Sequence, residues 1–371
     1  MPLYLSEDQA MLRDTAREFM AGEGHIAAQL RKYRDMGCKD GFGHALWKQF
    51  GEMGFTGILV PEADGGLGLG HVEAGIVLEE IGRNLTPSPF LITAVAVVEA
   101  LKGTALRERW YPPILAGDAV AALAVDEGPK HRPESIAMRA ERAGNGFRLT
   151  GRKQFVVQGA SADVILVAAR AEEGLTLFAV GKEATGLEVE GVRMVDSSIA
   201  ARMDFHGVEV DADAVVGEVG GGEAVLARVL AAGRAGAASE MVGLGSQAMA
   251  MTVDYLKQRK QFGRLIGEFQ VLQHRAAHLY SELEIARSAV LKAQQLLDEG
   301  SEEAEAMVSV AKAKAGWAST LAVQEGVQMH GGIGMTDEYD IGLYMKRDRA
   351  LNELFGDPGY HADRLARMKG Y

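Results

Sequence analysis

The spacing of apolar residues changes twice along this chain, and that change limits the possible folds. Up to about residue 115, apolar side chains recur at helical spacing, as in the stretches 46–55 and 72–81. Short β-rich segments separated by turn residues occupy about 119 to 210, and helical spacing then returns. No stretch of crossover-helix length separates the β-rich segments, so we expect neighbouring strands to pair antiparallel. This pattern excludes a doubly wound nucleotide-binding fold and predicts an α+β chain that is mainly α.

We predict three domains from this pattern: an N-terminal α-helical domain (1–117), a central antiparallel β domain (118–216) and a C-terminal four-helix bundle (217–371). Ser6 and Gln9 have the spacing of a capping box and predict the start of the first helix. The predicted strands are 121–125, 147–150, 155–157, 164–167, 175–180 and 203–205. The predicted bundle helices are 224–258, 269–298 and 302–329.

Charge and cysteine content exclude several classes of protein. The chain has 39 basic and 51 acidic residues and a net charge of -12, which argues against a nucleic-acid partner. Cys38 is the only cysteine, so no intrachain disulfide can form, and the nine histidines show no metal-binding spacing. The start of the chain lacks a basic stretch followed by an apolar run, which predicts a cytoplasmic location. The apolar runs are far shorter than the roughly 20 residues that a membrane span needs.

Three glycine-containing motifs follow one another along the chain. A Pro-Glu loop with four glycines occupies 61–70, three cations and a glycine lie in 259–264, and 329–334 contains three glycines. Each has a structural explanation alone: the glycines of 61–70 suit a turn, and helix C-termini favour the cations and glycines of the other two. Their order around a β region is more informative than any one of them.

In this order the motifs resemble the acyl-CoA dehydrogenase family over nearly the whole chain. The similar strings are GILVPEADGGLGLG (57–70), LEEIGR (78–83), LTGRKQFVVQGASAD (149–163), YLKQRKQFGRLIGEFQ (255–270) and VQMHGGIGMTDEYDIGLYMKRDR (327–349). The resemblance implies a flavoprotein that desaturates acyl-CoA thioesters, with the same three-domain fold. It also implies a tetramer and an electron-transfer flavoprotein as electron acceptor.

The resemblance implies that FAD lies at a subunit interface. The positions expected to contact its phosphates and adenine side are Arg259, Lys260, Gln261, Phe269 and Gln270. The positions that a neighbouring subunit is expected to contribute are Gln328, Gly331 and Gly332. The flavin ring is expected to lie against a wall of the β domain formed by Phe155, Val157 and Val125.

The flavin wall departs from the family pattern. Phe155 and Val157 stand where the family usually has Trp and Thr, so a hydroxyl donor is missing. The segment 124–133 reads AVDEGPKHRP, where the family has Thr-Glu-Pro-Gly followed by small residues. An acid at Asp126 close to the flavin would disfavour the negative charge of reduced FAD.

The usual catalytic base is also missing. The family's glutamate, which takes the α-proton of the thioester, corresponds to Gly356, and a second family location for it falls near Gly233. Asp357, next in the chain, and Glu240, two helical turns after Gly233, are the candidate replacements. Arg234 matches a position for contact with the substrate, where it would meet a CoA phosphate or form a surface salt bridge.

Two hypotheses therefore remain open at the level of sequence. In the first, the chain is a complete FAD-dependent acyl-CoA dehydrogenase with an unusual base, assembled as a homotetramer. In the second, it is the non-catalytic subunit of a heterotetramer, and it completes the FAD site of a related partner chain that carries the base. A scaffold that retains only the fold would be expected to lose the flavin motifs as well.

Overall fold

A computed structural model describes residues 3–371, and its internal contacts divide the chain into two compact units. The bundle unit contains the chain up to Ile26, His71–Thr86 and Arg234–Tyr371. The sheet unit contains Ala27–Gly70 and Pro87–Gly233. These units do not coincide with the three predicted domains, because the segments up to Ile26 and His71–Thr86 group with the C-terminal bundle.

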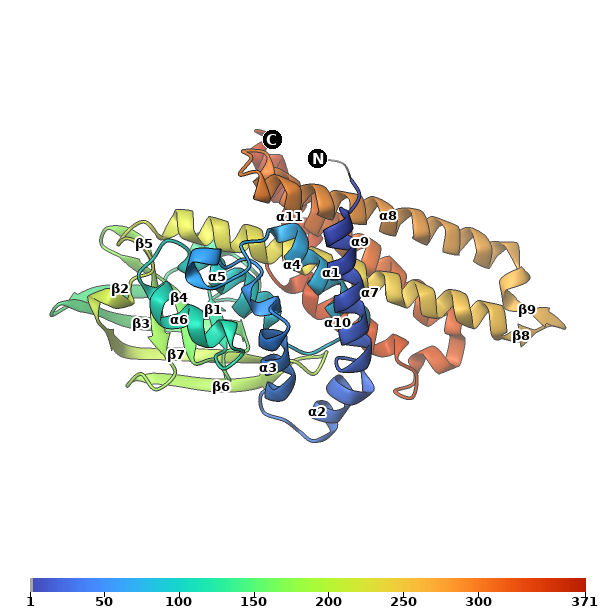
Figure 1. Ribbon diagram of the computed structural model, residues 1–371, viewed down its shortest axis with the longest axis horizontal. Coiled ribbons are helices and arrows are strands. Elements are labelled where there is room, and N and C mark those ends of the chain that lie inside the picture. The colour runs from blue at the N-terminus through green and yellow to red at the C-terminus, as the bar shows by residue number, and fades with distance from the viewer. Residues whose placement is uncertain (1–2) are drawn as a thin grey trace. The chain divides into compact units, whose positions relative to one another are not determined.

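The bundle unit is built from long helices, drawn in yellow, orange and red in Figure 1, with two N-terminal helices in blue. The first helix begins as predicted: Ser6 Oγ accepts from the N–H of Gln9 at 3.2 Å, and Gln9 Oε1 accepts from the N–H of Ser6 at 3.0 Å. The elements are α1 (Glu7–Gly22), α4 (His71–Asn84), α7 (Gly222–Gln258, from Arg234 onward), β8 (Lys260–Gln261), β9 (Arg264–Leu265), α8 (Gln270–Asp298), α9 (Ala304–His330), α10 (Ile341–Glu353) and α11 (Pro358–Met368), with short 3-10 turns at Ile266–Glu268 and Gly331–Met335.

Helix α4 belongs to the bundle unit because side chains of the bundle hold both of its ends. At its N-terminus, Asp298 of α8 accepts from the N–H groups of His71 at 2.6 Å and Val72 at 3.3 Å. Such a carboxylate satisfies donors that have no partner within the helix. At the other end, Tyr344 Oη of α10 donates to the carbonyl oxygen of Arg83 at 2.6 Å. These partners lie far away in sequence, so the grouping could not be read from local patterns.

The sheet unit contains one seven-stranded sheet with the order β1-β4-β2-β3-β7-β6, and β5 pairs with β4. Its apolar core lies on the sheet and includes Phe147, Phe178 and Phe205. The strands are β1 (Ala121–Ala124), β2 (Arg139–Ala143), β3 (Gly146–Val157), β4 (Val164–Ala171), β5 (Gly174–Gly181), β6 (Leu187–Arg193) and β7 (Ile199–Val210). The helical elements are the π-helices Ala27–Arg31 and Leu91–Val97, α2 (Lys32–Asp35), α3 (His44–Glu52), α5 (Val98–Leu101), α6 (Leu106–Leu115) and 3-10 turns at Phe55–Gly57, Glu62–Asp64, Pro133–Ser135 and Ala212–Ala214.

The sheet is mixed, so the prediction of a wholly antiparallel domain was wrong for two pairs, β1–β4 and the single parallel pairing of β2 with β4 at Arg139 and Arg170. The consecutive pairs β2–β3, β4–β5 and β6–β7 are antiparallel, as predicted. However, β1 pairs with β4 in parallel, with Ala121 opposite Val164. The prediction assumed that a parallel crossover needs a helix, whereas here the β2–β3 hairpin provides the crossover.

Two strands, β2 and β6, were not predicted because their sequences lack the alternation of apolar and polar residues that is typical of a strand. The outermost strand β6 is largely exposed and carries Glu188, Glu190 and Arg193, and β2 is a short strand with two arginines and a glutamate. The charges on the edge strand β6 hinder association with other sheets, and in both strands the charged residues leave no apolar alternation to recognise. Segments 147–150 and 155–157, predicted as separate strands, form the single strand β3, which has an irregularity between Lys153 and Val156.

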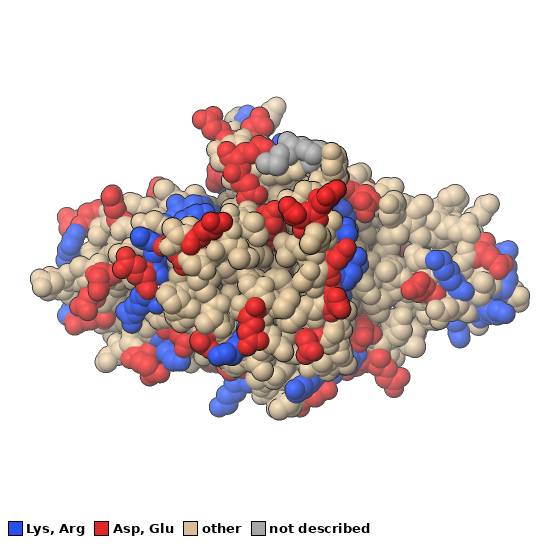
Figure 2. Space-filling view, in the orientation of Figure 1, with Lys and Arg blue, Asp and Glu red and all other residues tan. Residues whose placement is uncertain are grey.

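On the face shown in Figure 2, basic and acidic side chains are interspersed. Among residues 3–371, no helix combines the length and the apolar character needed to cross a bilayer. Within the same range, no cluster of histidine, cysteine and carboxylate side chains is arranged to hold a metal ion.

Candidate functional site

The turn between α10 and α11 contains the position expected for the catalytic base, and its backbone does not accept a side chain there. Gly356 is buried and has a φ of +105°, a conformation that residues with a Cβ rarely adopt. A Cβ on Gly356 would lie 2.3 Å from Cδ1 of Tyr360. A glutamate at this position would therefore require both the backbone and the tyrosine to move.

Two buried cations bind the carbonyl oxygens of this turn. Lys312 Nζ, on α9, donates to the carbonyl oxygens of Leu351 at 3.0 Å, Asn352 at 3.4 Å and Gly356 at 3.1 Å. The last carbonyls of a helix have no partner within the helix, and a cation there also interacts favourably with the helix dipole. The ammonium group of Lys312 thus fixes the C-terminal end of α10 together with the turn.

The second cation is Arg234. Its Nε donates to the carbonyl oxygen of Phe355 at 3.3 Å, and its Nη2 donates to Tyr360 Oη at 3.2 Å. Arg234 is only 3% exposed, so the alternative of a surface salt bridge was wrong. The predicted contact with a CoA phosphate stays a prediction, and it would require the guanidinium to leave these partners.

Burial determines the protonation of this cluster. Burial, followed by the like charge of Arg234, lowers the pKa of Lys312 to about 7. Burial also lowers the pKa of Arg234 to about 10. For His361, whose Nε2 lies 3.1 Å from the carbonyl oxygen of Phe355, burial and then the charges of Lys312 and Arg234 lower the pKa to about 2. The turn is therefore surrounded by hydrogen-bond donors.

The two candidate replacement bases already have structural partners. Asp357 is the N-cap of α11, and its Oδ1 accepts from the N–H of Tyr360 at 2.8 Å. Glu240 is buried on α7 and forms an ion pair with Arg347, at 2.7 Å from Nη2 and 2.8 Å from Nε. Their assignment as bases stays a prediction, and either residue would have to give up these interactions to accept a substrate proton.

A third carboxylate of this region was not singled out from the sequence. Asp348, on α10, accepts from Ser319 Oγ at 2.5 Å, Thr320 Oγ1 at 2.9 Å and Asn352 Nδ2 at 3.0 Å. Burial raises its pKa, while these hydrogen bonds oppose the rise. With three donors on its oxygens, Asp348 ties α10 to α9.

Lys312 was also missed, although the sequence contained a signal for it. It lies four residues after Val308 and three before Ala315, both buried, so it occupies the core face of its helix. A lysine on the buried face of a helix needs buried hydrogen-bond acceptors for its amino group. The helix carbonyls that provide them lie about 40 residues further along the chain and could not be identified from this pattern.

The predicted dinucleotide-binding residues gather at one end of the bundle unit, where Figure 1 shows the β8–β9 hairpin beyond α7 and α8. The ring of Tyr255 packs on His330 with centroids 4.5 Å apart, and Arg259 follows Tyr255 by one helical turn. The segments around Arg259 and Gly331 are therefore close together in one chain. The resemblance implies that the two segments reach FAD from different subunits, and that assignment stays a prediction.

This end of the bundle is open. Arg259, Lys260, Gln261, Gln270 and Gln328 are all exposed. A Cβ on either Gly331 or Gly332 would meet no atom within 4 Å, so a ligand can approach this backbone. Phe269 precedes α8 as its N-cap, and the guanidinium of Arg264 lies 4.0 Å from the centroid of its ring. These residues suit the phosphates and adenine of a dinucleotide.

The predicted flavin wall lies in the sheet unit. Val125 follows β1 and is buried, whereas Phe155 lies at the irregularity of β3 with a φ of +53° and is 47% exposed. The N–H of Gln154 donates to the carbonyl oxygen of Asp126 at 2.8 Å, which brings the two wall segments together. Val157 ends β3 and is half-buried. The three wall residues have apolar side chains and provide no hydroxyl group.

A buried ion pair holds the segment after β1 against β3. Lys153 is fully buried, and its Nζ donates to the carbonyl oxygen of Val125 at 3.0 Å and to Glu127 Oε1 at 2.8 Å. Glu127 also accepts from the N–H groups of Ala137 at 2.8 Å and Met138 at 3.0 Å. Burial lowers the pKa of Lys153. Burial would raise the pKa of Glu127, but the hydrogen bond and the charge of Lys153 outweigh it, so the pKa of Glu127 is lowered as well.

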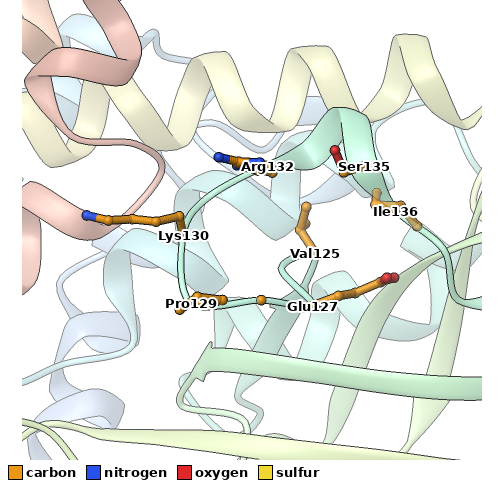
Figure 3. A pocket seen from close by; sticks show the side chains of 8 residues that line it. Val125, Glu127, Pro129, Lys130, Arg132, Ser135 and Ile136 are labelled. Atoms are coloured by element: carbon orange, nitrogen blue, oxygen red, sulfur yellow. The ribbon is translucent and has the colours of Figure 1, made fainter.

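Beside this segment lies a hollow of about 470 Å³, shown in Figure 3. Asp126 does not line it, because its carboxylate is bound within its own loop by His131 Nδ1 at 3.0 Å and the N–H of Arg132 at 3.1 Å. The lining residues are Val125, Glu127, Gly128, Pro129, Lys130, Arg132, Ser135 and Ile136.

Comparison with known proteins confirms the family that the motifs indicated. A family model described as the acyl-CoA dehydrogenase N-terminal domain matches residues 6–118, and one described as the C-terminal domain matches residues 220–369. This chain belongs to the acyl-CoA dehydrogenase family. Its members are flavoproteins and oxidoreductases that act on CH–CH bonds, and FAD-dependent dehydrogenation is characteristic of them.

Individual relatives cover almost the whole chain. Acyl-CoA dehydrogenase FadE12 of Mycobacterium tuberculosis is 32% identical over 93% of this chain and 91% of its own length. The mitochondrial isovaleryl-CoA dehydrogenase of Pongo abelii is 30% identical over 94% and 85%. A solved structure described as the Tcur3481-Tcur3483 steroid ACAD superposes with a TM-score of 0.90 at 28% identity and covers 98% of both chains.

Proposed function

We propose that this chain is the base-lacking subunit of a two-component, FAD-dependent acyl-CoA dehydrogenase. In this proposal it contributes the dinucleotide-binding end of its bundle, and a related partner chain supplies the base. FAD supplies the acceptor for the hydride that leaves the β-carbon of an acyl-CoA thioester. We expect an electron-transfer flavoprotein to reoxidise the flavin and the reaction to take place in the cytoplasm.

The observation that carries the proposal is the closed turn at Gly356. A missing glutamate alone could reflect a single substitution. Here, however, three features of the turn exclude a side chain at position 356. Gly356 has a positive φ, the ring of Tyr360 would lie 2.3 Å from a Cβ, and Lys312 binds the carbonyl oxygen of Gly356. A chain that abstracts protons with a carboxylate from this turn would not be expected to contain all three features.

The dinucleotide end supports the second part of the proposal. Arg259 presents a planar guanidinium that can bind two pyrophosphate oxygens, and Lys260 adds a second cation. Gly331 and Gly332 leave the backbone accessible, and Gln328 can donate from its amide. The cofactor side of the family pattern is thus kept, whereas the base and the hydroxyl groups of the flavin wall are lost.

One of the solved structures that resemble this chain supports a two-component assembly. The solved structure at 28% identity is named by two components, Tcur3481 and Tcur3483. A complete enzyme would instead need Asp357 or Glu240 as base. That alternative requires breaking the N-cap of α11 or the buried pair of Glu240 with Arg347.

The decisive experiment compares the chain purified alone with the chain co-expressed with a related, glutamate-containing chain. We expect the flavin absorption band, and its bleaching by saturated acyl-CoA without oxygen, only in the co-expressed complex. The Arg202→Gln variant is the control: it removes an exposed cation of the sheet unit and should leave the flavin band and its bleaching unchanged. Flavin that bleaches in the chain alone would overturn the proposal and would direct attention to Asp357→Asn and Glu240→Gln.

A further inference from the structure

One buried histidine lies beside the accessible backbone at the dinucleotide end. His330 ends α9 and is only 3% exposed. It directly precedes the two exposed glycines Gly331 and Gly332, which we call the glycine turn. We propose that His330 and Tyr339 are positioning residues, which anchor the glycine turn to the end of α7 so that its backbone is in place for the dinucleotide. This inference goes beyond the proposed function and rests on it only in that this end of the bundle binds FAD.

The hydrogen bonds of His330 determine its tautomer. Its Nδ1 lies 2.7 Å from the carbonyl oxygen of Gly326, which can only accept, so Nδ1 carries the proton. Burial lowers the pKa of His330, so the ring is neutral and Nε2 is an acceptor. Tyr339 Oη lies 3.2 Å from Nε2, and burial raises the pKa of this phenol, so Tyr339 donates. Both nitrogens are therefore bonded, and the ring cannot rotate without losing a bond.

The same ring links the end of α9 to the end of α7. Its centroid lies 4.5 Å from that of Tyr255 and 4.7 Å from that of Tyr339, so the three rings form one cluster. Tyr255 belongs to the last turn of α7, and its carbonyl oxygen accepts from the N–H of Arg259 at 2.9 Å. The cluster thus joins the helix end that precedes Arg259 to the residue that precedes the glycine turn.

The helical turn before His330 is closely packed. A Cβ on Gly326 would lie 2.8 Å from Cδ1 of Ile341 on α10 and 3.2 Å from Oγ1 of Thr252 on α7, so a glycine is needed for α9 to approach both helices this closely. The glycine turn itself has open space around it, because a Cβ on either glycine would meet nothing within 4 Å. The contacts of His330 therefore hold the accessible backbone where the close packing ends.

A binding backbone that is already in place favours the ligand. The bonds of His330 to Gly326 and Tyr339 exist in the chain without a ligand, so the cofactor loses less free energy in ordering its site. Removing them should weaken binding even though neither side chain touches the cofactor in this proposal. His330 and Tyr339 thus act through the glycine turn.

Flavin affinity tests this inference, measured in the form of the protein that contains flavin, which we expect to be the co-expressed complex. Tyr339→Phe removes only the hydroxyl group that donates to His330, and His330→Phe keeps an aromatic ring but removes both hydrogen bonds. We expect the affinity for FAD to fall roughly threefold for Tyr339→Phe and roughly tenfold for His330→Phe, as for one and two neutral hydrogen bonds. Dilution and the fluorescence of the released flavin measure both. If His330→Phe does not yield a folded protein, Tyr339→Phe decides alone.

Tyr344→Phe is the matched control for a merely structural role. It also removes the hydroxyl group of a buried tyrosine, which donates to the carbonyl oxygen of Arg83 on α4 at 2.6 Å. It should lower the urea concentration at the midpoint of unfolding and leave the affinity for FAD unchanged. An equal loss of affinity in Tyr344→Phe would contradict the inference, since the loss would then follow from stability alone.

Arg259→Ala separates this inference from the proposed function. If Arg259→Ala weakens flavin binding while Tyr339→Phe and His330→Phe do not, the inference is wrong, but the dinucleotide end remains assigned. If none of the three variants changes the affinity, or if no form of the protein binds flavin, both the inference and the assignment of this end are overturned.

Discussion

Two glycine-containing ends of the bundle unit differ in the space around them. At the turn after α10, a side chain on Gly356 would collide with Tyr360, and buried cations bind the surrounding carbonyls. At the end of α9, side chains on Gly331 and Gly332 would meet nothing within 4 Å. The first site is closed around its own backbone, and the second is open to a ligand. This difference is what we expect if the chain lacks the catalytic base and binds the cofactor, as we propose.

The largest expected effect is that of Gly356→Glu. A residue with a Cβ at this φ costs about 1–2 kcal/mol, and burying a carboxylate where Lys312 and Arg234 already donate to backbone carbonyls costs several more. We therefore expect the free energy of unfolding, measured with urea, to fall by at least ~3 kcal/mol, with no flavin bleaching in the chain alone.

Gly332→Ala is the matched control for that substitution, because it adds a methyl group to open space and should change stability by less than ~0.5 kcal/mol. A Gly356→Glu variant as stable as the wild type would show that the turn is not closed. If it also bleached a flavin, the two-component proposal would lose its main support.

The second effect concerns Lys312 and pH. The pKa of Lys312 is about 7 in the folded chain and 10.5 for an ordinary lysine, so the folded state binds fewer protons between these values. Stability from this group is therefore complete above pH 10.5 and is lost as pH falls towards 7, with a slope of up to ~1.4 kcal/mol per pH unit. The difference in unfolding free energy between wild type and Lys312→Met should rise with pH across this window.

Lys314→Met provides the comparison on the same helix. Lys314 is partly exposed and pairs with Glu282 at 2.5 Å, so its loss should cost less than ~1 kcal/mol. A flat difference curve for Lys312→Met would mean that Lys312 stays charged throughout, and that the carbonyls of the turn offset its burial more fully than proposed.

The smallest effect is expected at the open end. In the co-expressed complex, Arg259→Ala removes a charge-assisted contact to the cofactor and should weaken flavin binding by roughly tenfold to a hundredfold, without lowering stability. Dilution and fluorescence of the released flavin measure this. Lys257→Ala, another exposed cation at the end of α7, is the control and should leave the affinity unchanged. Unchanged affinity for Arg259→Ala would contradict the assignment of this end to the dinucleotide.

Local patterns in the sequence predicted much of this molecule. The capping box at Ser6 and the starts and ends of α7, α8 and α9 were predicted to within about two residues, because helical spacing and end signals lie within a few residues of each other. The order of the motifs indicated the family, and counting on from the last motif placed a glycine, Gly356, where the family's base is expected. These features depend on residues close together in the chain.

The tertiary structure decided what depends on distant partners. Asp298 attaches α4 to the bundle, and the β2–β3 hairpin allows β1 to pair in parallel with β4. Lys312 finds its acceptors about 40 residues away, and Tyr360 blocks the space beside Gly356. Periodicity indicates which side of a helix or strand is buried but not which segment covers it. For that reason the sequence could show that a glycine stands where the family's base is expected, while only the packing showed that this turn has no room for a side chain.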